Sequence, residues 1–291
     1  MEIMEILKKF DTQEKCIGYL EELRWSGEPQ CPYCGSTEFT TKRKELRYRC
    51  KSCNNSFSVL VGTIMESTKL PLPKWFAAIC LILNAKKGIS SLQLSRDIGV
   101  NKNTAWYVQK RIRQAMDEDD TILGGIVEAD ETFVGGALGN KHQKHRSKFD
   151  KTGMQHKTPV LGMMERNGKI CVKVLFKAWG NEIKPVLLKK IDPESEIITD
   201  GFGGYQGIGK YFKKHIKLNH SKGIRVEGEY HTNTLEGFWS MLKRSIIGQY
   251  HKVTPIHLQG YVDEIAFKYN YRNSNDAFKI LMTNALNTGM P

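Results

Sequence analysis

The spacing of apolar and polar residues divides the chain into four segments. In residues 1–28 apolar side chains recur at helical intervals, which predicts a helical segment that ends near Gly27; they are Ile6, Phe10, Ile17, Leu20 and Leu23. Residues 29–62 are short, cysteine-punctuated runs that favour β-hairpins, and residues 68–118 read as helices interrupted at Gly88 and Gly99. From residue 122 to residue 291 strand-like runs alternate with helices, which predicts an α/β domain.

The third segment, residues 68–118, contains the pattern of a helix-turn-helix. Ser90 is expected to cap a short helix, Gly99 to form a turn and Asn101 to cap a second helix, whose inner side holds Ala105, Val108 and Ile112. The exposed amino-terminal residues of the second helix are of types that contact base edges or phosphates in a major groove; they are Lys102, Asn103, Thr104 and Tyr107. An ordinary helical hairpin is the alternative.

Two acids of the α/β segment stand at or next to predicted strands. Alternation over residues 126–134 puts Glu128, Asp130 and Thr132 on one strand face and Val127, Ala129 and Phe133 on the other. An acid in the middle of a strand is unusual unless it has a function. Asp200 follows a short predicted strand, at the carboxyl end where open α/β sheets place ligands, although Asp before Gly also marks a plain turn.

A third acid, Glu236, lies on a predicted helix. The apolar stripe of this helix is formed by Leu235, Phe238, Trp239, Leu242 and Ile246. At roughly 100° per residue, Glu236 lies at the border of the stripe, and Lys243 projects at nearly the same angle. A carboxylate and a cation are therefore expected together at the edge of the core. Alternatively, Glu236 is the acid of a capping box behind Asn233.

The amino-acid composition indicates what kind of molecule the protein binds. The chain holds 44 Lys and Arg against 31 Asp and Glu, a net charge of +13 over 291 residues, and such a field attracts polyanions, most commonly nucleic acid. The longest strongly apolar stretch, residues 75–85, is well below the roughly 20 residues that cross a bilayer, and no signal-peptide pattern is present. We therefore expect a cytoplasmic protein without membrane partners, associated with the nucleoid when it binds DNA.

Four of the seven cysteines have the spacing of a metal site. Cys31 and Cys34, then Cys50 and Cys53, form two C-x2-C pairs with fifteen residues between them. This spacing predicts one Zn²⁺ in a zinc ribbon over residues 29–62, and a closed four-cysteine site is structural because no coordination position stays open. A redox pair or chance spacing is the alternative. The isolated cysteines Cys16, Cys80 and Cys171 suit a reducing compartment.

Six motifs accompany the acids. They are Ala129-Asp-Glu-Thr-Phe-Val-Gly-Gly136, Thr158-Pro-Val-Leu-Gly-Met-Met-Glu-Arg166, Thr199-Asp-Gly201, His231-Thr-Asn-Thr-Leu-Glu-Gly-Phe-Trp-Ser-Met-Leu-Lys-Arg244, Gly248-Gln-Tyr-His251 and Phe267-Lys-Tyr-Asn-Tyr-Arg272. Thirty-five residues, 201 to 235, separate Asp200 from Glu236, as in many transposases and integrases with a D,D-35-E pattern. Together these motifs resemble the ISXO-type insertion-sequence transposases over nearly the whole chain, most specifically around Glu236.

The resemblance implies a ribonuclease H-like mixed sheet flanked by helices as the catalytic domain, residues 122–291, of a DDE-type DNA transposase. It implies that Asp130, Asp200 and Glu236 hold two Mg²⁺ or Mn²⁺ ions, which prefer such hard oxygen ligands. By analogy with ribonuclease H-like folds, Asp130 would bridge both ions while the other two acids hold one each.

The same resemblance implies the reaction and its partners. Lys243 is the basic residue that follows the triad, and His231 and Arg244 are further candidates to contact DNA. The enzyme would bind double-stranded DNA at the element ends and in the target, nick it to free 3′ ends and transfer those ends. Pairing two ends implies a homo-oligomer in the DNA complex.

Two further readings and one segment stay open at this point. A zinc-ribbon and helix-turn-helix regulator with a degenerate carboxyl domain is disfavoured because all three acids are present. Another ribonuclease H-like nuclease, which cuts without strand transfer, fits the same acids. The basic segment 137–157, with six Lys and Arg, three His and one acid, is either a solvated loop or a contact with DNA phosphates.

Overall fold

The computed structural model describes residues 3–137, 139, 156–218, 226–228 and 230–289. The chain forms two compact units, residues 1–117 together with 271–291, and residues 118–270. The second unit therefore ends before the boundary at residue 291 that the sequence predicted. The reason is that helix α10 (Ala277–Asn287) packs in the first unit, where Phe278 stacks against Phe10 and meets Phe76 edge-on.

The first unit begins with two helices where the apolar periodicity suggested one. Helix α1 spans Ile3–Lys9 and α2 spans Gln13–Trp25. The chain breaks at Thr12 because its hydroxyl caps α2 by accepting a hydrogen bond from the amide of Lys15. Helix α2 ends as predicted, at Ser26 and Gly27, whose positive φ angles of 48° and 91° turn the chain away.

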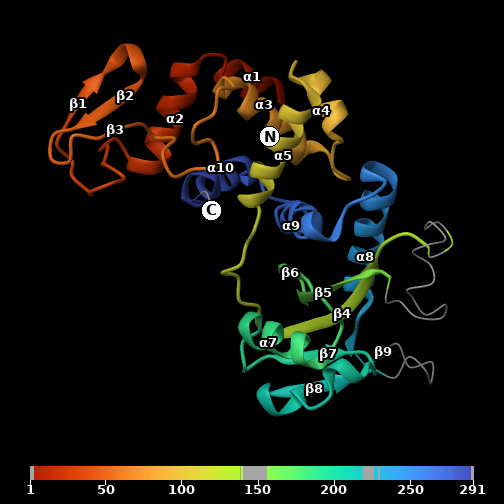
Figure 1. Cartoon of the computed structure of the whole chain (residues 1–291). Helices are drawn as coiled ribbons and strands as arrows, with labels where there is room; N and C mark the ends of the chain where they lie inside the picture. The colour runs from red at the N-terminus through yellow and green to blue at the C-terminus, as the bar shows by residue number, and fades with distance from the viewer. Residues whose placement is uncertain (1–2, 138, 140–155, 219–225, 229, 290–291) are drawn as a thin grey trace. The chain divides into compact units, whose positions relative to one another are not determined.

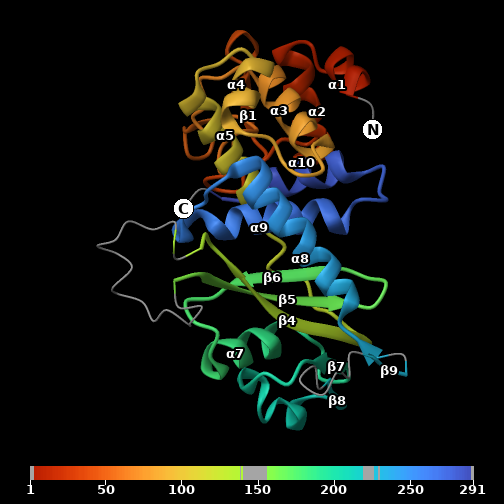
Figure 2. The same ribbon diagram turned by 90° about the vertical axis from the view of Figure 1, so that its right-hand side faces the viewer.

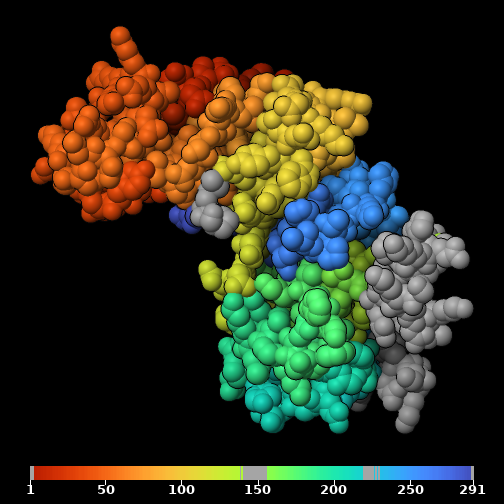
Figure 3. Space-filling model, in the orientation of Figure 1, coloured from red at the N-terminus to blue at the C-terminus, as the bar shows by residue number. Residues whose placement is uncertain are grey.

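The predicted hairpins of the cysteine-rich segment are confirmed. Strands β1 (Phe39–Lys42), β2 (Arg47–Cys50) and β3 (Ser56–Phe57) form an antiparallel sheet in that order, with a 3-10 turn, η1 (Arg43–Glu45), between the first two. Two of the cysteines share a small core with aromatic side chains; it contains Cys31, Cys50, Phe57, Trp25 and Phe39. In Figure 3 this ribbon, in orange, forms one end of the first unit.

Three further helices follow in the first unit, α3 (Leu72–Asn84), α4 (Ser91–Asp97) and α5 (Lys102–Gln114). The predicted caps are confirmed, because Ser90 accepts from the amide of Gln93 and Asn101 from the amide of Thr104. Gly99, at φ 61°, forms the turn between α4 and α5. Among the described residues, every helix is too short or too polar to span a bilayer.

The second unit is built on a five-stranded mixed sheet in the order β6-β5-β4-β7-β8 (Figure 1). Its strands are β4 (Ile126–Val134), β5 (Thr158–Glu165), β6 (Ile170–Val174), β7 (Glu196–Thr199) and β8 (Lys214–Lys217). Strands β4, β5 and β6 are antiparallel neighbours, whereas β7 runs parallel to β4 and β8 parallel to β7. A separate ribbon joins β9 (Val226–Glu227) to β10 (Tyr230–His231).

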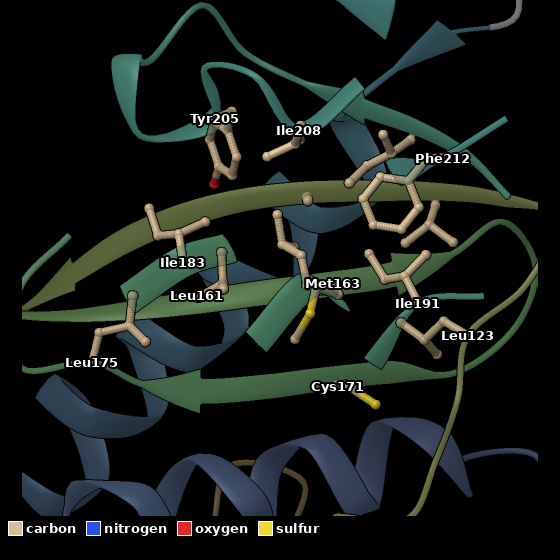
Figure 4. Close-up of a cluster of buried hydrophobic side chains, with 14 residues drawn as sticks. Leu123, Leu161, Met163, Cys171, Leu175, Ile183, Ile191, Tyr205, Ile208 and Phe212 are labelled. Atoms are coloured by element: carbon tan, nitrogen blue, oxygen red, sulfur yellow. The ribbon is translucent and has the colours of Figure 1, made fainter. Parts of the chain in front are cut away.

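Helices cover both faces of this sheet. Helix α7 (Gly180–Lys190) lies on one face, and α8 (Asn233–Ser245) and α9 (Pro255–Asn270) lie on the other, with a π-helical turn (Ile246–Tyr250) between them (Figure 2). Val127 and Ala129 point into the α7 core together with Tyr205 of a 3-10 turn, η3 (Gly203–Tyr205) (Figure 4). Val134 joins the α8 core. The predicted alternation along β4 is thus confirmed.

A glycine lets α8 approach the sheet closely. Gly162 of β5 is paired with Asp130 of β4. A Cβ atom at residue 162 would lie 2.6 Å from the indole of Trp239 and 2.9 Å from the side chain of Leu235. Both neighbours are large, buried side chains of α8. Any side chain at this position would therefore push the helix away from the strand that carries Asp130.

We expect Gly162→Ala to lower the free energy of unfolding by about 1–3 kcal/mol because of this overpacking. The matched control is Gly237→Ala on α8, where a Cβ atom meets nothing within 4 Å. This control should raise the helical propensity and stabilise the protein by roughly 0.5–1 kcal/mol. Urea denaturation followed by tryptophan fluorescence measures both. A Gly162→Ala protein as stable as the parent would contradict the close approach.

Candidate active site and metal centre

The three predicted acids come from three different elements. Strands β4 and β7 pair in parallel up to the residue before each acid, so Asp130 and Asp200 come next on neighbouring strands. The indole Nε1 of Trp239 on α8 donates a hydrogen bond of 2.9 Å to Oδ2 of Asp130. Glu236 lies three residues before Trp239, which places the two residues on neighbouring turns of one helix face. Sheet and helix thus bring the acids to one region.

The charges of these acids act on one another. Burial, as the largest cause, and the negative charges of Asp200 and Glu236 together raise the pKa of Asp130 to about 6, while the Trp239 hydrogen bond opposes the change. Like charges held this close destabilise the ionised site. A divalent cation would relieve that repulsion, and carboxylate oxygens are the ligands that Mg²⁺ prefers. The donor set therefore fits such an ion.

A fourth acid, which the sequence reasoning did not single out, lies beside them. Glu131 points to the α7 side of the sheet, where its Oε2 accepts a 2.7 Å hydrogen bond from the hydroxyl of Tyr205. Figure 4 shows this hydroxyl directed toward β4. Burial, together with the charges of Asp130 and Asp200, raises the pKa of Glu131 to about 7. Its place next to Asp130 in sequence was the signal available beforehand.

Glu128 joins β4 to the start of α8. Its side chain is completely buried and forms an ion pair of 3.1 Å with the guanidinium of Arg166. The hydroxyl of Thr234 and the backbone amide of Leu235 donate to its two oxygens at 2.9 and 3.0 Å. We call this set of contacts the Glu128 clamp. It satisfies an amide at the amino terminus of α8, a role that a capping residue usually fills.

The capping alternative for Glu236 is therefore wrong. Helix α8 begins at Asn233 with Thr232 as its N-cap, so Glu236 is the fourth helical residue and not the third, as a capping box requires. Its side chain is exposed instead. Asp200 directly follows β7, as predicted. It also stabilises the turn after the strand, because its Oδ1 accepts a 2.9 Å hydrogen bond from the amide of Phe202.

The basic residues of α8 point to solvent. Lys243 is exposed two turns after Glu236. Arg244 is also exposed, and its guanidinium donates to the carbonyl and hydroxyl oxygens of Ser240, one turn back. Lys243 is thus an exposed cation on the same helix as Glu236, whereas the side chain of Arg244 lies against its own helix.

His231 lies against the Glu128 clamp. Its Nε2 is 3.2 Å from Nη1 of Arg166, and its Nδ1 is 3.5 Å from Oε1 of Glu128. The ring is only partly exposed, because it packs against the clamp. As a DNA contact, His231 remains a prediction.

The other predicted DNA contacts lie on α5 and in the basic segment. Lys102, Asn103 and Tyr107 are exposed on α5, whereas Thr104 is half-buried. The guanidinium of Arg111 lies 4.5 Å from the ring centroid of Tyr107. In the segment 137–157, residue 138 and residues 140–155 are outside the described residues.

The four predicted cysteine ligands do come together. The sulfur atoms of Cys31, Cys34, Cys50 and Cys53 all lie within 4.8 Å of one another, and the cysteines are free thiols. After each C-x2-C pair the chain turns through a left-handed residue, Gly35 at φ 74° and Asn54 at φ 63°. The two pairs thus form a four-cysteine cluster, which fits the tetrahedral preference of zinc.

We expect one zinc per chain in the purified protein. Cys50→Ser should abolish this binding and unfold the ribbon, because the metal replaces much of a hydrophobic core there. Elemental analysis measures the zinc content, and limited proteolysis reports on the ribbon. Cys171→Ala, in the second unit, is the control and should retain the metal. Full zinc content in Cys50→Ser would refute the four-cysteine site.

The acid cluster makes the stability of the metal-free protein depend on pH. The folded chain holds a proton on Asp130 up to pH about 6, whereas the unfolded chain loses it near the ordinary value of 3.8. Because the folded state binds more protons across that window, stability should fall as pH rises through it. We therefore expect Asp130→Asn to flatten this fall and to be more stable than the parent at pH 8.

Thermal unfolding in a chelating buffer between pH 4 and pH 8 measures the effect. Glu194→Gln removes an exposed acid of the same unit and should leave the slope unchanged. An identical pH slope in the parent and in Asp130→Asn would contradict the electrostatic coupling of the cluster.

Comparison with known proteins gives a consistent result for both units. Residues 122–270 match the family described as the ISXO2-like transposase domain, and residues 11–56 match the transposase zinc-ribbon domain. A Halobacterium salinarum protein described as an "Uncharacterized protein in transposable element ISH50" is 26% identical over 252 residues, 82% of this chain and 84% of that protein. An "Uncharacterized transposase-like protein" of Haemophilus influenzae is 25% identical over 113 residues, 39% of this chain and 90% of that protein.

Proposed function

The chain belongs to the ISXO2-like transposase family, and from this premise we propose that it is a DDE-type enzyme that nicks insertion-sequence ends and joins the freed 3′ ends to target DNA. The observation that carries this proposal is the convergence of Asp130, Asp200 and Glu236. Each acid comes from a separate element, and the charges of the other two raise the pKa of Asp130.

The sheet supports a ribonuclease H-like fold for the catalytic unit. Its first three strands are antiparallel neighbours, and the fourth and fifth add in parallel on the other side of the first. Asp130 lies on the central strand, Asp200 directly follows the adjacent one, and Glu236 is supplied by a helix packed on the same sheet. This arrangement supports the assignment of the three acids to one site.

We assign Asp130, Asp200 and Glu236 as the residues that would hold two Mg²⁺ or Mn²⁺ ions. Mg²⁺ prefers such hard oxygen ligands, and the ions of two-metal sites lie roughly 3.5–4 Å apart. When bound, such ions supply a reactive hydroxyl or 3′ oxygen and neutralise the leaving oxygen.

The side chains around the acids prepare the site. The indole of Trp239 fixes one oxygen of Asp130. The Glu128 clamp fixes the start of α8 and therefore the position of Glu236 relative to β4. Lys243, exposed on the same helix, offers a cation to a phosphate of the DNA strand being cut.

DNA binding follows from the family, and we assign its details to the first unit. The two capped helices α4 and α5 would act as a helix-turn-helix that presents Lys102, Asn103, Thr104 and Tyr107 to double-stranded DNA. The β1–β2 hairpin of the zinc ribbon, which carries Lys42, Arg47 and Arg49, adds positive charge. Pairing of two element ends would require a homo-oligomer in the DNA complex.

The test uses a supercoiled plasmid that carries both element ends, incubated with the protein and Mg²⁺. Asp130→Asn and Glu236→Gln should each reduce nicking by about 100-fold or more, because they remove ligands whose supporting groups alone contribute 10–100-fold. DNA binding in a gel-shift assay should persist. Glu194→Gln is the matched control and should nick as the parent does.

The products separate the three readings of the site. Nicked ends joined to a target plasmid are expected from a transposase. Cutting without joining would make the chain a nuclease, and binding without cutting in the parent would make it a regulator. Nicking that survives Asp130→Asn would overturn the assignment of the acids.

A further inference from the structure

Three aromatic side chains are exposed at the edge of the sheet where Asp200 lies. Phe176 is 86% exposed, Trp179 56% and Phe202 38%. Phe176 and Trp179 follow β6, and Phe202 follows β7. Both strands run in the direction of β4, so their carboxyl ends reach the same edge of the sheet. We call these residues, with Lys177, the aromatic edge.

Close backbone contact connects the two parts of the aromatic edge. A Cβ atom at Gly180, next to Trp179, would lie 3.0 Å from the carbonyl oxygen of Gly204. A Cβ atom at Gly204 would in turn lie 2.6 Å from the ring of Phe202. The start of α7 therefore touches the turn that the Phe202 ring covers. In Figure 3 the surface of α7 and its flanking segments, green to teal, faces the viewer.

The backbone beneath these exposed rings is held in place. The carboxylate of Glu182, in the first turn of α7, accepts hydrogen bonds from the amides of Phe176 at 2.9 Å and Lys177 at 3.1 Å. The carbonyl of Trp179 accepts from the amide of Ile183 at 2.9 Å. Exposed aromatic rings on such a fixed backbone lose little conformational entropy when they bind a flat ligand.

Charge and position indicate what that ligand is. The Nζ atom of Lys177 lies 4.0 Å from the ring centroid of Trp179 and 5.9 Å from that of Phe176. A cation beside exposed rings matches the combination that binds unpaired nucleotides, in which bases stack on aromatic side chains and phosphates meet lysine. The backbone amide of Phe202 also donates to Asp200, so the Phe202 part of the aromatic edge adjoins one of the proposed catalytic acids.

We infer that the aromatic edge binds unpaired DNA bases next to the proposed catalytic site at Asp200. The bases of a duplex stack on each other and hide their faces, so only unpaired nucleotides can reach these rings. A protein partner fits less well, because Lys177 interrupts the apolar surface and would need a counter-charge. The inference rests on the proposed function and names the state of the DNA at that site.

The experiment measures equilibrium binding of the full chain in a chelating buffer, where no cleavage occurs. The probes are a blunt duplex that carries the element end, and the same duplex with a short unpaired tail containing 2-aminopurine, whose fluorescence falls on stacking. The tailed probe should bind more tightly and be quenched. Trp179→Ala should reduce the affinity of the protein for the tailed probe about 5- to 100-fold, the range of one lost base–aromatic stack. Its affinity for the blunt duplex should not change.

Matched variants separate stacking from other effects. Trp179→Phe should keep most of the preference for the tail, and Phe176→Ala should lose part of it. Leu188→Ala removes another exposed apolar side chain of α7, 44% exposed, and should change nothing. Equal affinity for both probes in the parent, or an equal loss in Leu188→Ala, would overturn the inference.

Two further outcomes are decisive. If Trp179→Ala abolishes self-association in sedimentation velocity and leaves the tail preference intact, the edge binds a second copy of this chain and the inference is wrong. Because binding is measured without metal, the result is independent of the nicking assay. If the parent shows no preference for the tailed probe and nicking still depends on Asp130, the aromatic edge is rejected and the proposed function stands.

Discussion

The close docking of α8 on β4 and β5 is the contact on which the candidate active site depends. Two features make it possible: Gly162 leaves room for the Trp239 indole, and the buried carboxylate of Glu128 satisfies polar groups at the start of the helix. A buried charge is costly unless it is paired, and Arg166 supplies the pair. Without this docking, Glu236 would have no defined position relative to Asp130.

The same docking gathers negative charge at a cost to stability. Asp130 and Glu131 both have raised pKa values, to about 6 and about 7, because burial and neighbouring acids disfavour their ionised forms. A sequence selected for stability alone would avoid such a cluster. The site is understandable if cations complete it, since they would convert mutual repulsion into ligation. Tyr205 moderates the cost for Glu131 through its hydrogen bond.

The first unit is stabilised in a different way in each of its parts. The zinc ribbon has only a few buried side chains, so its cysteine cluster supplies what a small hydrophobic core cannot. The helical part has a full core, in which Phe10, Phe76 and Phe278 join segments distant in sequence. The first unit is therefore made of modules that are stabilised independently of each other.

Local features of this protein could be read from the sequence because neighbouring residues encode them. The caps Ser90 and Asn101, the alternation of β4 and the cysteine spacing all act within a few residues or a single hairpin. Even the break at Thr12 has a local cause. The spacing of the three acids, read through the family resemblance, predicted a metal-binding triad, and this assignment remains a proposal.

Tertiary structure decided the rest, because those contacts join residues that no local pattern relates. The sequence around Glu236 also allowed it to cap its own helix. In the structure Glu128, more than a hundred residues away, binds an amide at the start of α8 instead. The pairing of Glu131 with Tyr205 likewise depends on how α7 and its neighbouring turns pack on the sheet. Local patterns determined the elements of this chain, whereas their packing selected which polar side chains are buried, paired and available for chemistry.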